Sequence, residues 1–173
     1  MKPLILFVSA AFLWAAPPPS PSAWGKTSWG MTADQIKRAY PGEAIDLPAD
    51  GNSLFRVDGG ERNAQVGIPM TEIEGTDFRV SFLIGAAGLD NIIISPVDEA
   101  SQSRDVFAKL QSALVVKYGE PFSNGTAENG IGMTMSQWKT KTSLIQLRFI
   151  EISNISTNFV TLSYQRLPAG NKL

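Results

Sequence analysis

Three carboxylates, Glu72, Glu74 and Asp77, lie close together in the sequence and could do acid–base chemistry. Side chains two residues apart on a strand face the same side of a sheet, so Glu72 and Glu74 would be neighbours. Paired carboxylates supply the acid and the base of glycoside hydrolysis. A solvated strand face carries the same residue types without any catalysis, so a plain polar surface is the alternative interpretation.

The sequence contains no histidine and no cysteine. These absences exclude the Ser-His-Asp triad, the Cys-His pair, disulfides and metal sites built on imidazole or thiolate ligands. None of the Asp/Gly turns has the alternating oxygen ligands of a calcium loop. A phosphate-binding loop, a dinucleotide fingerprint and a nucleophile elbow are also missing. We therefore predict no catalytic residue, no cofactor and no metal, which means a protein that is not an enzyme.

Trp24 and Trp29, each followed by a glycine, form the most unusual local pattern. Tryptophan is enriched in the hot spots of protein interfaces, so the two residues are the candidate partner-binding site. The structural alternative is that Trp29 packs as a hydrophobic staple near a helix start while Trp24 covers a sheet edge.

Residues 1–23 have the pattern of a signal peptide followed by a Pro/Ser linker. Lys2 precedes an apolar run over residues 3–14, and two alanines and a Pro/Ser stretch follow. The run is shorter than the roughly 20 residues that a membrane-spanning helix needs. We expect an exported protein, periplasmic or extracellular, cut after Ala15 or Ser22 and without a stable membrane anchor afterwards. An uncleaved anchor is the alternative.

The rest of the chain has the length and composition of one domain, over residues 24–167, with a tail at 168–173. Hydrophobic residues make up 43% of the chain, charged residues 18%, and the formal net charge is −1. Because no basic block could release counterions from a phosphate backbone, we expect no nucleic-acid partner. The expected partner is an unidentified protein or envelope component.

Two helices are predicted. Thr32 and Gln35 match a capping box, which starts a short helix that stops before Pro41. The second helix covers residues 101–118, where apolar side chains recur at helical spacing, and Gly119 ends it.

Alternating apolar and polar residues predict strands, and a Gly/Asn-rich loop is expected at residues 123–132. Weak strand patterns cover 53–57, 64–68 and 71–73, and clearer ones cover 78–84, 89–95, 133–141, 143–152 and 159–166. Arg79 and Arg148 occupy polar positions of this alternation, as on a strand buried on one side.

These elements predict an α+β fold, a two-layer domain in which two helices pack on one face of an antiparallel sheet. Each helix ends in a tyrosine with Gly and Pro close by, at Tyr40 and Tyr118. This echo leaves open a duplicated helix-plus-three-strand unit, with ordinary helix-capping chemistry as the alternative.

The segment Trp29-Gly30-Met31-Thr32, with Tyr40-Pro41-Gly42 and the later Lys117-Tyr118-Gly119-Glu120-Pro121, resembles small exported proteobacterial proteins of unknown function. The element order is also similar to that of the β-lactamase inhibitory protein and of small outer-membrane assembly lipoproteins. These resemblances imply a periplasmic binding or assembly role. The chain lacks the lipid-anchor cysteine of the lipoproteins and the disulfides of the inhibitory protein, and no functional residue is carried over.

The expected function is that of a non-catalytic exported module that binds a protein or an envelope component. Two alternatives stay open. One is a small-molecule carrier with a pocket between the second helix and the sheet, lined by Phe107, Leu110 and Leu114. The other is a carboxylate-dependent hydrolase of cell-wall sugars that uses Glu72, Glu74 and Asp77.

Overall fold

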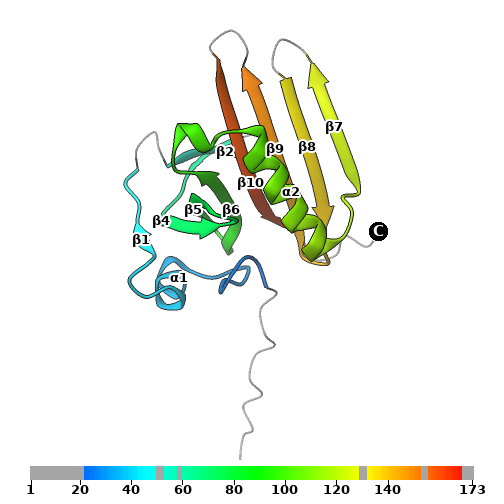
Figure 1. Cartoon of the computed structure of the whole chain (residues 1–173). Helices are drawn as coiled ribbons and strands as arrows, with labels where there is room; N and C mark the ends of the chain where they lie inside the picture. Colours follow the sequence, from blue (N-terminus) through cyan, green and yellow to red (C-terminus); the bar gives the residue numbers. More distant parts are fainter. Residues whose placement is uncertain (1–21, 50–52, 58–59, 129–131, 153–155, 169–173) are drawn as a thin grey trace, which may run out of the picture.

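The computed structural model describes residues 22–49, 53–57, 60–128, 132–152 and 156–168 (Figure 1). Residues 1–21, with most of the expected signal segment and the Ala15 cut, lie outside the described residues, as do tail residues 169–173. Within the described part, no helix combines the length and the hydropathy that crossing a bilayer requires.

Ten strands form in the described part of the chain. They are β1 (Ile45–Asp46), β2 (Leu54–Val57), β3 (Gly60–Asn63), β4 (Val66–Ile73), β5 (Thr76–Gly85), β6 (Gly88–Pro96), β7 (Ser123–Glu128), β8 (Gly132–Lys139), β9 (Ser143–Ile152) and β10 (Thr157–Arg166). The helical elements are α1 (Ala33–Ala39), the 3₁₀ helix η1 (Glu99–Ser101) and α2 (Arg104–Tyr118).

Local capping chemistry sets the ends of both α-helices. The capping box at the start of α1 is confirmed, because Thr32 N donates to Gln35 Oε1 at 2.8 Å and Gln35 N donates to Thr32 Oγ1 at 3.4 Å. Ser103 caps α2, so this helix starts three residues later than predicted. Gly119 ends α2 with a φ of 81°, a conformation that favours glycine.

The predicted α+β fold is wrong, because the described structure is mostly sheet, with 53% strand and 19% helix. Eight strands form one antiparallel sheet in the order β1-β4-β5-β6-β10-β9-β8-β7, and β2 pairs with β3 in a separate hairpin. A repeated helix-plus-three-strand unit does not describe this arrangement.

The strands that the sequence missed have few apolar residues. The segment expected as a loop at residues 123–132 contains β7, an edge strand of the sequence SNGTAE that pairs only with β8. The polar segment GERN forms β3 because it pairs with β2. In both cases the neighbouring strand, rather than local β-propensity, decides the structure.

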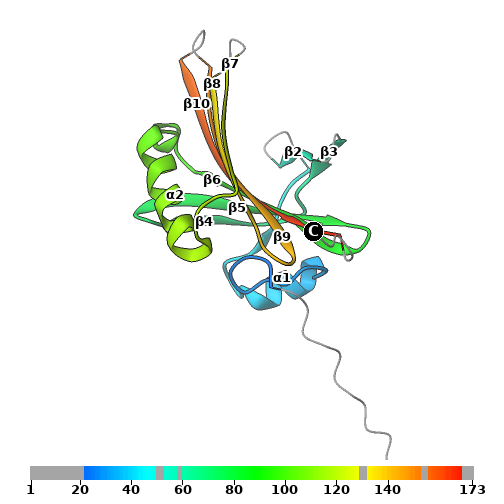
Figure 2. The ribbon, with the colours of Figure 1, turned by 90° about the vertical axis from the view of Figure 1, so that its right-hand side faces the viewer.

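The eight-stranded sheet has two unequal faces, which we call the core face and the outer face. Both α-helices and the segment before α1 pack on the core face, and Figure 2 shows α2 on one side of the sheet and the β2–β3 hairpin on the other. Buried core-face residues include Trp29, Ile36, Phe78, Val80, Phe82, Ile92, Ile94, Leu110, Leu114, Leu147, Phe149, Val160 and Leu162.

The β2–β3 hairpin covers one end of the outer face. Its Phe55 and Val57 pack on a small buried cluster of Ala64, Leu83 and Ile93. A bidentate ion pair fixes the hairpin further, because Arg62 Nη1 and Nη2 each lie 2.9 Å from a carboxylate oxygen of Asp90 on β6. The hairpin therefore holds Phe55 in a defined place above the sheet.

Candidate functional site

The outer face contains a fork between β6 and β10. Their pairing runs as far as Ile94 and Leu162, and β6 then ends at Pro96. The next amide of β10, Val160 N, donates instead to the side-chain oxygen of Gln102 at 2.6 Å. Gln102 therefore satisfies this backbone amide at the point where the two strands separate.

A pocket of about 370 Å³ lies at this fork. Its walls come from β2, β5, β6, β9, β10 and the region of η1. The lining residues are Phe55, Arg56, Arg79, Ile93, Ser95, Pro96, Val97, Glu99, Gln102, Arg148, Phe159, Val160 and Thr161. The pocket therefore combines apolar walls with three guanidinium groups, the mixture that small binding sites usually show.

Arg148 on β9 is the residue that sets this pocket apart. Its Nε is buried, and no hydrogen-bond acceptor is in reach of it among the residues that the structure describes. Burial lowers the pKa of the Arg148 guanidinium from its ordinary value. An arginine nevertheless stays protonated at neutral pH. Because a buried charged donor without a partner is costly, Arg148 favours any anion that enters the pocket.

Arg79 on β5 is the second cation without a firm partner. Its Nη2 lies 3.5 Å from the carbonyl oxygen of Val97, at the limit of a hydrogen bond. No ion pair joins Arg79 or Arg148 to a carboxylate in the described ranges. By contrast, Arg56 has Glu61 at 3.3 Å.

The charge balance of the pocket is positive, since one carboxylate, that of Glu99, lines it beside Arg56, Arg79 and Arg148. Guanidinium groups bind carboxylates and phosphates with two parallel hydrogen bonds, and such charge-assisted bonds are stronger than neutral ones. Arg79 and Arg148 come from different strands, line the same pocket and pair with no carboxylate in the described ranges, so an anion in this pocket would meet two guanidinium groups.

The structure does not bring Glu72, Glu74 and Asp77 together on one strand face. β4 ends at Ile73, so Glu74 lies in the turn to β5, with a φ of 51°, while Glu72 pairs with Asp77. All three residues are exposed. Within the described ranges, no group of three or more acidic, His or Cys residues is arranged to hold a metal ion.

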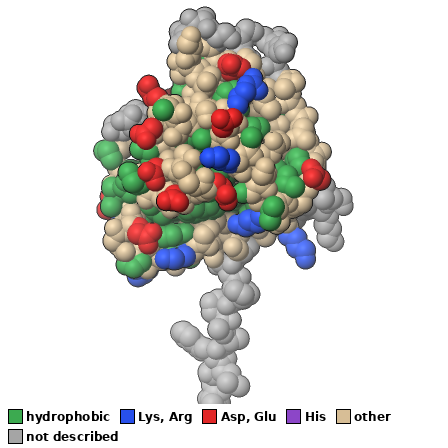
Figure 3. All heavy atoms as spheres, viewed as in Figure 1, with side chains coloured by type: hydrophobic (Ala, Val, Ile, Leu, Met, Phe, Trp, Pro, Cys, Tyr) green, Lys and Arg blue, Asp and Glu red, His purple; other side chains and the backbone are tan. Residues whose placement is uncertain are grey.

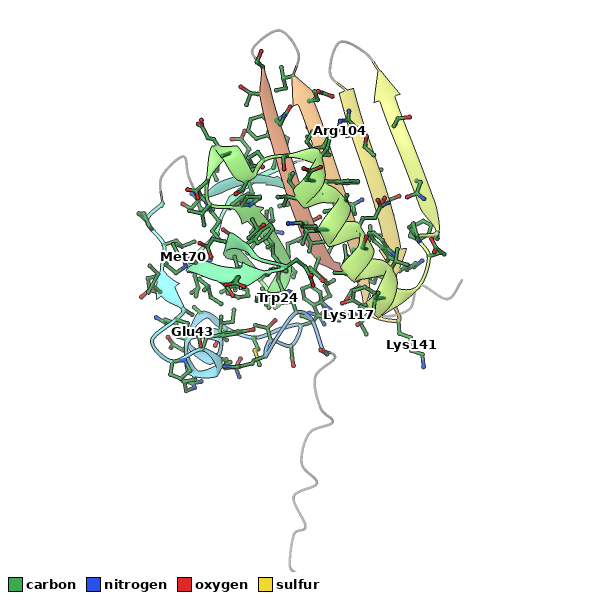
Figure 4. The ribbon with its side chains drawn as sticks, viewed as in Figure 1. Trp24, Glu43, Met70, Arg104, Lys117 and Lys141 are labelled. Carbon is green, nitrogen blue, oxygen red and sulfur yellow. The ribbon has the colours of Figure 1, made fainter. Side chains whose placement is uncertain are left out.

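The two tryptophans have different environments. Trp29 is 2% exposed, and its Nε1 donates to Ser143 Oγ at 3.0 Å, so its side chain belongs to the core. Trp24 is half-buried and stacks on Tyr40, with 6.4 Å between the ring centroids, near α1 (Figure 4). Of the predicted partner-binding pair, Trp24 keeps an exposed part, and its contact with a partner stays a prediction.

The side chains expected to line a carrier pocket are core residues. Phe107, Leu110 and Leu114 are buried between α2 and the sheet. Phe107 packs against Phe149, with 6.2 Å between ring centroids. These contacts are those of a packed helix–sheet interface.

No protein-family model, curated protein or solved structure matches this chain. The resemblances drawn from the Trp-Gly-Met-Thr and Tyr-Pro-Gly motifs therefore stay predictions.

Sequence reasoning placed Arg79 and Arg148 on the polar side of their strands but did not connect them. That both line one pocket depends on the β6–β10 pairing, which no local pattern encodes. The available signal was an arginine at a polar position in the middle of each of two alternating strands.

Proposed function

We propose that this protein is a non-catalytic binding module that holds an anionic group of its partner between Arg79 and Arg148. The observation that supports this function is the buried Nε of Arg148, which has no acceptor in the described structure. A carboxylate or phosphate in the pocket would supply that acceptor and balance the charge.

The surroundings of the two arginines would strengthen such a contact. Phe55, Ile93 and Phe159 line the same pocket and give it apolar walls. Charge-assisted hydrogen bonds gain strength where the local dielectric constant is low. The site would therefore bind an anion better than two arginines on an open surface would.

Nuclear magnetic resonance of the arginine Nε–Hε groups tests this function, with acetate and inorganic phosphate as probes. We expect saturable shifts of the Arg148 and Arg79 signals on addition of at least one probe. In Arg148→Gln, the Arg79 shift should need an anion concentration about tenfold higher, the equivalent of about 1.4 kcal/mol.

Arg104→Gln is the matched control for this titration. Arg104 lies on the opposite side of the sheet and already pairs with Glu151 at 2.7 Å. Its replacement should leave the titration unchanged. If neither probe gave a saturable shift in the wild-type protein, the proposed function would be wrong.

Export is part of the same proposal and rests on the order of charge, apolar run and Pro/Ser stretch in residues 1–23. Cell fractionation of the full chain with a C-terminal tag tests it. We expect a shortened protein outside the cytoplasm, and a full-length protein in the cytoplasm would contradict the proposal.

A further inference from the structure

An apolar strip continues from the pocket across the outer face. It consists of Phe159 on β10, Ile150 on β9, and Met133 and Met135 on β8. Ile150 lies opposite both Phe159 and Met133, and Met135 lies opposite Arg148. Side chains directly opposite each other in neighbouring strands are about 5 Å apart, so the four residues form one surface beside Arg148.

The apolar strip is accessible. Phe159 is 43% exposed, and the other three side chains are half-buried. None of the four belongs to either hydrophobic cluster of the described residues. The strip is therefore not explained by the packing of the described chain.

The residue types of the strip and the pocket are those of a protein interface. Phe, Met and Arg are enriched in protein–protein contacts, and Met side chains adapt their shape to a partner. Phe159 belongs to both the strip and the pocket wall, so the apolar surface and the two arginines are continuous.

We propose that the partner is a protein that presents an Asp or Glu carboxylate with large apolar side chains next to it. The carboxylate enters the pocket between Arg79 and Arg148, and the apolar side chains cover the strip. This inference rests on the proposed function, because it needs the pocket to bind an anion.

Charge favours this occupant over a membrane surface. An anionic bilayer attracts clusters of several exposed basic side chains. Here the unpaired charges are two arginines recessed in one pocket, with Glu99 beside them. Such a site fits a single carboxylate better than the many phosphate headgroups of a bilayer surface.

Selection from a random peptide library displayed on phage, with the folded chain as bait, tests the inference. We expect enriched peptides to share an acidic residue flanked by large apolar residues. One synthetic peptide from the selection is then the probe for measuring affinity by fluorescence anisotropy. Arg148→Gln and Met133→Ser should each weaken its binding about tenfold.

Val116→Ser is the matched control, because Val116 is an apolar residue that is 89% exposed on α2, away from the strip. It should bind the peptide as the wild-type chain does. Circular dichroism of each variant shows whether it is folded. Phe159→Ser provides a second test of the strip if Met133→Ser does not fold.

The two proposals fail in different ways. If both strip variants bind the peptide normally, or if the selected peptides lack acidic residues, this inference is wrong while the anion titration still supports the pocket. If Arg148→Gln changes neither peptide binding nor the acetate and phosphate titrations, both proposals are wrong. The proposal of a protein partner would also be wrong if the selection returned no peptides while the chain bound vesicles of anionic phospholipid independently of Arg148.

Discussion

The core face and the outer face of the sheet differ in how their buried polar atoms are satisfied. On the core face, Trp29 Nε1 donates to Ser143 Oγ at 3.0 Å, and Trp138 Nε1 donates to the carbonyl oxygen of Gly119 at 2.8 Å. On the outer face, Arg148 Nε is buried and has no acceptor in the described structure. Stability alone explains the first arrangement but not the second.

The two sides also differ in how their charges are paired. Acidic and basic side chains are interspersed over the α2 side of the molecule (Figure 3). Arg104 on that side pairs with Glu151 at 2.7 Å and lies over the ring of Phe149. Arg79 and Arg148 have no such partner. Because natural sequences tend to depart from good pairing at functional sites, this contrast supports our proposal that the core face serves folding and the outer face serves binding.

The largest expected loss of stability follows from truncating a buried side chain of the core face. Phe82 is fully buried and packs against Tyr40, with 6.3 Å between the ring centroids. Phe82→Ala should lower the free energy of unfolding by about 3–5 kcal/mol, because it leaves a cavity. Urea denaturation measures this change. If Phe82→Ala lowered the free energy of unfolding no more than the exposed control Val116→Ala does, the core face would not be the part that stabilises the fold.

A smaller loss is expected where a core-face polar pair is broken. Ser143→Ala removes the acceptor of the buried Trp29 N–H and should cost about 1–3 kcal/mol in the free energy of unfolding. The control is Ser112→Ala, at an exposed position of α2. Equal urea midpoints for the two variants would mean that the Trp29–Ser143 bond does not contribute.

The β2–β3 hairpin contributes Phe55 to the pocket on the outer face, and an ion pair holds the hairpin in place. The side chains of Arg62 and Asp90 are 29% and 31% exposed, so solvent screens their ion pair. Asp90→Asn should therefore lower the free energy of unfolding by about 1 kcal/mol. It should also weaken anion binding, because Phe55 is no longer held above the sheet. Glu43→Gln, which breaks the exposed Lys26 pair away from the pocket, serves as the control. If anion titrations of the two variants coincide, the hairpin does not shape the pocket.

The smallest effect on stability is expected in the apolar strip. Met133→Ser should change the free energy of unfolding by within about 0.5 kcal/mol, since the side chain belongs to neither hydrophobic cluster. The same urea titration measures it. A loss comparable to that of Phe82→Ala would place the strip in the core and weaken the distinction between the two faces.

The sequence predicted the helices and the apolar strands because their signals are local. Thr32 with Gln35, and Gly119 after the second helix, mark helix ends through contacts a few residues apart. The alternation in residues 143–152 likewise shows which side of β9 is buried. Each of these signals is contained in one segment of the chain.

The fold class and the site depend on contacts between distant segments. β3 and β7 have polar sequences and form strands because they pair with β2 and β8. Sequence reasoning missed both strands and therefore underestimated the share of sheet in the fold. The pocket lies where β6 and β10 separate and where the side chain of Gln102 accepts from the amide of Val160. Neither that hydrogen bond nor the placement of Arg79 and Arg148 in one pocket has a local sequence pattern.

Arg148→Met tests the division between the two faces most directly, because Met has a similar reach and no charge. We predict a free energy of unfolding equal to or higher than that of the wild-type chain, since the substitution removes a half-buried charge whose Nε is buried without an acceptor in the described structure. The saturable shift of the Arg79 Nε signal with acetate or phosphate should disappear. A loss of about 2 kcal/mol or more with anion binding retained would show that Arg148 serves the fold and would contradict the account.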